Sequence, residues 1–138
     1  MHSRNKIENS RKLHFVKNII IHNNFSSHLL HDIAIIQLHY PIFYTNHSRP
    51  ICLPEVNSSL PEHNCWISGW GYSNSLPNGS GYKGDSGGPF FCRNNNIYTL
   101  YGVASFRPPF AAPGTLTSYV RVSSHVNWIT DTMKNANL

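Results

Sequence analysis

The stretch from Gly84 to Pro89, Gly-Asp-Ser-Gly-Gly-Pro, constrains the fold of this chain more than any other segment. Three glycines and a proline within six residues disfavour a helix, because these two residue types have the weakest helix propensity. Glycines crowd a serine where the backbone must turn sharply and let a substrate carbonyl approach closely. Because the amides of such a turn can stabilise an oxyanion, Ser86 is a candidate nucleophile.

Two other motifs overlap this stretch, and the surrounding sequence argues against both. Residues 79–84 match G-x-G-x-x-G, a dinucleotide fingerprint that needs a strand before it and a helix after it. A proline-containing loop precedes it here, and the glycine-rich stretch follows. Residues 84–88 match the G-x-S-x-G nucleophile elbow, which requires an acid and then a histidine downstream. Only His125 and then Asp131 follow, in the reverse order, and no βαβ alternation is present.

The rest of the chain is typical of an all-β protein with one terminal helix. Residues 33–38 are apolar on both faces apart from Gln37, so we expect a strand buried on both sides. Residues 40–60 contain three prolines and are expected to form an extended connector. Runs rich in β-branched and aromatic residues predict strands over residues 15–21, 33–38, 65–70, 89–92, 97–105 and 115–122.

A helix is expected only at the end of the chain. Val126, Ile129 and Met133 recur at helical spacing and would share one buried face. Ser123 or Ser124 would cap its amino end.

Length and charge narrow the function classes. The 138 residues fit one domain, and the formal charge of +5 is mild and concentrated near the amino end. Such a run is usually a solvated face, and no nucleic-acid motif accompanies it, so we expect no nucleic-acid partner. The first twenty residues have no apolar core of a signal peptide, and no run reaches transmembrane length.

The asparagine sequons point to a secretory parent, and the cysteines and histidines give no sign of a metal site. Three cysteines are too few for a disulfide scaffold and fit no zinc spacing, and the histidines show no ligand spacing paired with acids. We therefore expect no metal and no cofactor. Four N-glycosylation sequons favour export to the cell exterior or the extracellular side of a membrane. They begin at Asn24, Asn46, Asn57 and Asn78.

The Gly84–Pro89 stretch and seven further segments, in order along nearly the whole chain, resemble the chymotrypsin/trypsin-like serine proteases. The Gly84–Pro89 stretch is similar to the family's GDSGGP motif, residues 31–38 to its "NDIALIKL" strand, and residues 65–71 to "CWVSGWG". The remaining similarities are those of residues 20–25 to "IIxHPxY", 49–54 to the stretch linking the two barrels, 102–106 and 113–114 to "GIVSWG" and "PGVY", and 126–129 to the terminal helix.

The resemblance implies a role for five residues. Ser86 would be the nucleophile, and Asp32 the buried carboxylate that orients the catalytic histidine. The amides of Gly84 and Ser86 would form the oxyanion hole. Ser105 would sit beside Asp32 and help to hold its charge. Asp85 pairs in the family with a freed amino terminus, which is not present here, so we expect its side chain to point outward or its loop to be disordered.

The chain departs from the family in its base and its pocket. No segment resembling "AAHC", which carries the catalytic histidine, is found among the 31 residues before Asp32, and His14, His22, His28 and His31 are expected to be surface residues. Only residues 72–83 lie between two motifs that relatives separate by roughly fifty residues, a stretch that includes two strands of the second barrel. Pocket residues implied by the resemblance are Ser80, Phe106, Arg107 and Gly114.

The resemblance also assigns the cysteines. Cys65 and Cys92 match the pair that staples the second barrel. Cys52 matches the cysteine that joins the catalytic domain to its propeptide or stalk in two-chain relatives, so it is expected to be free and to mark a missing partner chain.

The sequence therefore predicts an all-β, incomplete trypsin-like double barrel with a C-terminal helix. Residues 1–48 would be a remnant of the first barrel, 49–64 the linker, and 65–138 a shortened second barrel with the helix. The family hydrolyses peptide bonds of protein or peptide substrates through an acyl-enzyme. We expect this chain, as an isoform or fragment, to be inactive; the alternative is a secreted pseudoprotease that acts as a binding or decoy module.

Overall fold

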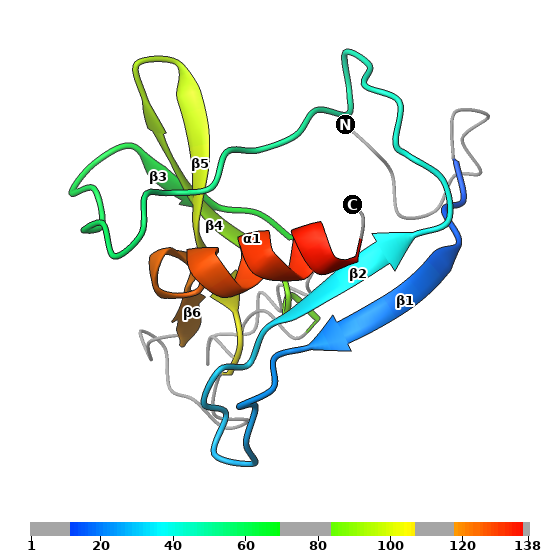
Figure 1. The fold of residues 1–138 in the computed structure, drawn as a ribbon. Coiled ribbons are helices and arrows are strands. Elements are labelled where there is room, and N and C mark those ends of the chain that lie inside the picture. Colours follow the sequence, from blue (N-terminus) through cyan, green and yellow to red (C-terminus); the bar gives the residue numbers. More distant parts are fainter. Residues whose placement is uncertain (1–11, 70–83, 107–117, 137–138) are drawn as a thin grey trace, which may run out of the picture.

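The computed structural model describes residues 12–69, 84–106 and 118–136. Six strands of the described residues form two separate sheets. One α-helix lies across the space between the sheets (Figure 1). The elements are β1 (Val16–Ile21), β2 (Ala34–Leu38), β3 (Cys65–Ile67), β4 (Pro89–Asn94), β5 (Ile97–Ala104), β6 (Tyr119–Arg121), the 3₁₀ turn η1 (Val122–Ser124) and α1 (Val126–Asn135).

The first sheet is an antiparallel pair of β1 and β2, and its burial differs from the expectation. The two strands pair from Val16 opposite Leu38 to Ile21 opposite Ala34. In β2 the side chain of Ile36 is 59% exposed, whereas Gln37 is buried. The expectation of a strand covered on both faces is therefore wrong, because only the face that carries Gln37 packs against the rest of the described chain. The Gln37 amide donates to the carbonyl of Ala136 at 3.4 Å.

The second sheet has the order β3-β4-β5-β6, with all neighbours antiparallel. A two-residue loop, Asn95–Asn96, joins β4 to β5, and both residues have positive φ (46° and 65°). This conformation matches the twist of the flanking strands, and asparagine tolerates it better than most residues. β3 and β6 are shorter than the sequence predicted, and β4 runs two residues further. Residues 70 and 115–117 of the predicted strands lie outside the described residues.

The terminal helix forms, but the expected serine cap does not. His125 occupies the N-cap position, and no side chain there bonds to the first turn. Ser123 is instead buried in η1, where its hydroxyl donates to the carbonyl of Ser58 at 3.2 Å. Val126 and Ile129 are buried, whereas Met133 is 40% exposed. The buried face of α1 is therefore confined to its first two turns.

A small core forms where β2, β6, η1 and α1 meet. Ile33, Val120, Val122 and Ile129 are its buried members, with Ile35, Leu100, Val103 and Trp128 packed against them. Neither described sheet closes into a barrel. Large apolar side chains of β1 consequently remain in solvent, among them Ile19 and Ile21, each 58% exposed.

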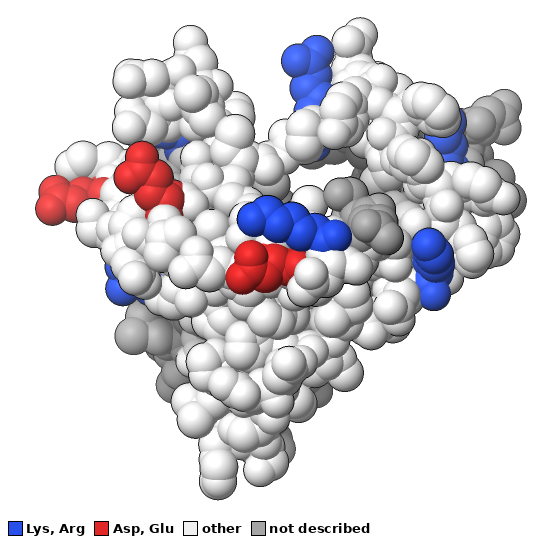
Figure 2. Space-filling view, viewed as in Figure 1, with Lys and Arg blue, Asp and Glu red and all other residues white. Residues whose placement is uncertain are grey.

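Charged side chains are scattered on the described surface. On the face shown in Figure 2, lysine and arginine lie apart from one another and form no continuous basic patch. Within the described residues, no helix is both long and apolar enough to cross a membrane.

Candidate active site

The turn that carries Ser86 is fixed by its own glycines and by β5. Gly84 and Gly87 have φ values of 103° and 81°, which glycine adopts without the steric penalty that a side chain would bring. The amide of Gly87 donates to the carbonyl of Ala104 at 2.7 Å, and the amide of Gly88 donates to the carbonyl of Asp85 at 2.8 Å. The sharp turn therefore presents Ser86 next to the end of β5.

Asp85 points into the protein, which corrects the expectation that it faces outward. Its carboxyl group lies directly against the backbone of Gly69, where a Cβ would overlap it. Burial raises the pKa of Tyr119, and the negative charge of Asp85 raises it further. Asp85 is half-buried and lies near the end of β3 and Tyr119 of β6. Glycine at position 69 leaves it that room.

Asp32 and Ser105 are brought together from positions 73 residues apart. The Ser105 hydroxyl donates to Oδ2 of Asp32 at 2.6 Å, a short distance typical of a bond to an ionised oxygen. Asp32 immediately precedes Ile33 of the core, and Ser105 follows β5. The Ser86 hydroxyl donates to the carbonyl of Ser105 at 3.5 Å, which is a long and weak bond. Ser105 thus lies between the candidate nucleophile and the candidate carboxylate.

A hollow of about 560 Å³ opens beside Ser86. Among the described residues, its lining contains no histidine, and no histidine bonds to the Ser86 hydroxyl. Phe106 is 44% exposed at the end of β5. The other expected pocket residues, Ser80, Arg107 and Gly114, lie outside the described residues. The lining consists of Ser68, Gly69, Gly84, Asp85, Ser86, Gly87, Gly88 and Pro89.

Three histidines gather at a second place, and the sequence analysis did not group them. His22, His31 and His125 each offer one ligand atom, and these atoms lie within 4.8 Å of one another. Burial lowers the pKa of His22, and repulsion from His31 and His125 lowers it further. His22 and His31 were both expected at the surface. His22 is partly buried, so the expectation is wrong for it, whereas His31 is exposed as expected. Ligand spacing along the sequence gave no signal, because His125 lies about a hundred residues from the other two.

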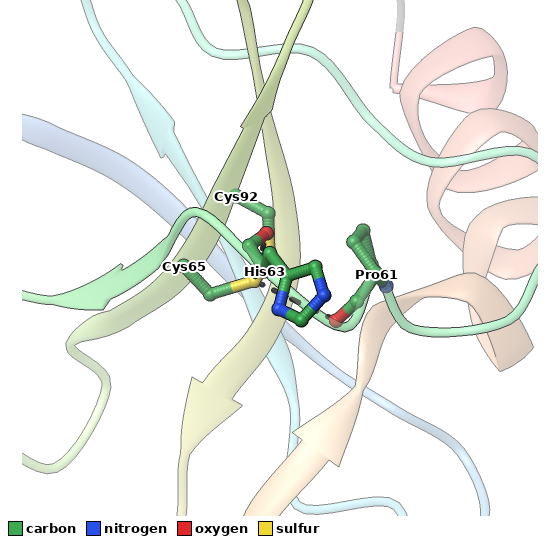
Figure 3. Close-up of a disulfide and its surroundings, with 4 residues drawn as sticks. All are labelled: Pro61, His63, Cys65 and Cys92. Carbon is green, nitrogen blue, oxygen red and sulfur yellow. Dashed lines mark hydrogen bonds between the residues drawn. A yellow bond between two sulfur atoms is a disulfide. The ribbon is translucent and has the colours of Figure 1, made fainter.

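A disulfide joins Cys65 of β3 to Cys92 of β4 (Figure 3). The carbonyl oxygens of Pro61 and His63 lie 3.8 and 3.4 Å from Sγ of Cys65. Because a disulfide sulfur carries no hydrogen, these are van der Waals contacts. Cys52 is exposed and has no disulfide partner among the described residues. Of the sequon asparagines, Asn24, Asn46 and Asn57 are exposed, and Asn78 lies outside the described part.

Comparison with known proteins adds to this geometry. A family model described as Trypsin matches residues 1–79 and 78–129. Testisin from Homo sapiens is 26% identical over 172 aligned positions, which cover 91% of this chain and 55% of Testisin. Ovochymase from Halocynthia roretzi is 29% identical over 168 positions, covering 89% of this chain and 11% of Ovochymase. The chain thus spans about half the length of Testisin and a small part of Ovochymase.

Proposed function

The chain belongs to the trypsin family of serine proteases, and we propose that the sequence printed here does not itself hydrolyse peptides. The observation that carries this proposal is the environment of Ser86. Its hydroxyl meets a backbone carbonyl, which cannot accept its proton during attack on a substrate. Without an imidazole base, a serine hydroxyl at neutral pH is a weak nucleophile.

The remaining triad geometry supports a protease ancestry for the site. The Ser105 hydroxyl donates to one oxygen of the Asp32 carboxylate. The second oxygen could accept a hydrogen bond from a histidine. Among the described residues, the amides of Gly84 and Ser86 donate no backbone hydrogen bond to a carbonyl. Two amides in such a turn are the donors that an oxyanion hole requires. We infer that the nucleophile, the carboxylate and the oxyanion donors remain while the base is missing.

The comparisons with relatives support an internal deletion, which would itself favour the inactive state. The two family matches meet at residues 78 and 79, within the short segment 72–83. The Testisin alignment runs over 172 positions although this chain has only 138 residues, so Testisin carries residues that this chain lacks. We assign the missing residues to this segment, where relatives build one wall of the specificity pocket. An alternatively spliced product of a protease gene would account for the deletion.

The proposed organisation follows the two sheets. β1 and β2 would be the remnant of the first barrel within residues 1–48, and β3 to β6 with α1 the shortened second barrel within 65–138. The disulfide favours passage through an oxidising compartment, so we propose a secreted or membrane-anchored parent. The exposed Cys52 would join a propeptide or stalk chain of that parent.

A hydrolysis assay tests the proposal. The oxidised, purified chain and its Ser86→Ala variant are incubated with casein and with peptide esters of basic, aromatic and small residues. We expect equal rates for the two proteins, at the level of buffer. A rate that exceeds buffer and disappears with Ser86→Ala would overturn the inactive assignment.

Folding separates the inactive product from the pseudoprotease alternative. A binding module must be a soluble, cooperatively folded monomer, whereas a by-product with open sheets and exposed isoleucines is expected to associate. We expect aggregation or no cooperative unfolding transition above about 45 °C, the lower end of ordinary domain stability. A sharp transition of monomeric protein above that temperature would favour the binding module.

A further inference from the structure

Three histidines from separate elements converge on one point at the junction of the first sheet and the helix. His22 follows β1, His31 lies in the turn before β2, and His125 is the N-cap of α1. Their imidazoles offer one ligand atom each within a mutual distance of 4.8 Å. Imidazole nitrogen is a common ligand of zinc, copper and nickel ions in proteins.

One pair of nitrogens has nearly the spacing of a tetrahedral ion, and the three ligand atoms lie within 4.8 Å of one another. Nδ1 of His31 lies 3.0 Å from Nε2 of His125. Two nitrogens bound to one tetrahedral zinc at about 2.05 Å are separated by roughly 3.3 Å, so these two atoms need to move by only a few tenths of an ångström. The ring of His22 stacks on that of His31 with centroids 4.6 Å apart, and His125 meets both rings edge-on at 5.3 and 5.2 Å.

Contacts with a backbone carbonyl and with Trp128 orient two of the rings. Nδ1 of His125 lies 2.8 Å from the carbonyl of Arg121 and donates to it, which leaves the lone pair of Nε2 directed at the cluster. This carbonyl bond to the far ring nitrogen is the arrangement that usually accompanies a metal-bound histidine. Trp128 packs on the ring of His22 with centroids 4.7 Å apart, so the indole of α1 holds that imidazole in place.

The electrostatics of the cluster favour a cation that binds neutral imidazoles. Three protonated rings at these distances would repel one another, and the nearest acid in sequence, Asp32, is already bonded to Ser105. A divalent metal uses the neutral form of each ring. His125 is buried and His31 is exposed, so one side of the cluster is anchored in the protein and the other is open to water.

We propose that His22, His31 and His125 bind a zinc ion, with water as the fourth ligand. Three protein ligands and an open position accessible to solvent are one of the established zinc arrangements. The ion would connect the end of β1, the turn before β2 and the start of α1. Within the described residues, β1 pairs with β2 and contributes no member to the small core. The site is independent of the proposed loss of protease activity.

Binding is tested on the full oxidised chain with Cys52→Ser as background, because an exposed thiol also binds zinc. Isothermal titration with Zn²⁺ gives the affinity, and the visible absorption of added Co²⁺ reports tetrahedral coordination. His31→Asn is the informative variant, because residue 31 has a φ of 54° and asparagine tolerates that conformation. His39→Gln is the matched control, since His39 is exposed and lies outside the cluster.

We expect one Zn²⁺ per chain and a tetrahedral Co²⁺ spectrum. In His31→Asn the Kd should rise roughly 100-fold or more, because even the loss of a group that only orients a metal ligand lowers metal affinity 10- to 100-fold. His39→Gln should bind as the background does. Equal affinity in the background and in His31→Asn would overturn the proposal. So would absence of Co²⁺ absorption in a background chain whose circular dichroism shows that it is folded.

Discussion

Removing the disulfide between Cys65 and Cys92 should destabilise the second sheet by an amount that its loop length sets. The cysteines are 27 residues apart, and a cross-link over such a loop lowers the entropy of the unfolded chain by about 12 cal/mol/K. At 25 °C this corresponds to about 3.5 kcal/mol, a large part of the 5–15 kcal/mol typical of a whole domain. The bond also secures β3, which has only three residues paired to β4.

The assay is urea unfolding of a Cys65→Ser/Cys92→Ser variant, followed by far-ultraviolet circular dichroism. With an m value of about 1.5 kcal/mol/M, the midpoint should fall by roughly 2.3 M, and a chain of low initial stability should be unfolded without urea. Cys52→Ser is the control and should leave the midpoint unchanged, because that thiol is exposed and outside the bridge. A double variant that unfolds at the midpoint of the parent chain would refute the reasoning.

Two further predictions concern the carboxylate and the histidine cluster. Ser105→Ala removes the 2.6 Å hydrogen bond to Asp32 and should lower the free energy of unfolding in urea by about 1.5 kcal/mol. The control Ser124→Ala, on the exposed side of η1, should change that free energy by less than about 0.5 kcal/mol. Equal effects of the two substitutions would contradict the role of the bond. The pKa of His22 in the folded chain lies below its ordinary value of 6.5, so on acidification the unfolded chain takes up the proton first. In metal-free buffer the free energy of unfolding should therefore be retained above pH 6.5 and decrease as the pH falls below 6.5. His22→Gln should flatten that slope in a urea titration at several pH values, and an unchanged slope would assign the effect to other groups.

Local pattern was sufficient to predict the strands, whereas the pairing of Cys65 with Cys92 followed from the family resemblance. Alternating and β-branched runs specify β1 and β5 because side-chain periodicity and backbone preference agree there. The resemblance placed Asp32 beside Ser105, and the structure joins them by a short hydrogen bond. These features depend on residues whose partners are fixed by the order of the motifs.

Features that depend on missing or distant neighbours could not be predicted from the sequence. Ile36 is exposed and Gln37 buried because the strand has a packing partner on one face only, and an apolar run does not reveal which face that is. His125 occupies the N-cap position of α1 because Ser123 is buried in η1. The histidine cluster joins residues from both ends of the described chain, so no local pattern marks it.

The reactivity of Ser86 tests the central claim most directly. The purified, oxidised chain is exposed to a fluorophosphonate, which labels only serines that an adjacent base activates, with Ser86→Ala in parallel. We predict no labelling of a soluble, folded sample, equal to the variant. Labelling of the parent chain that the variant loses would contradict the account, because some group would then be acting as the base for Ser86.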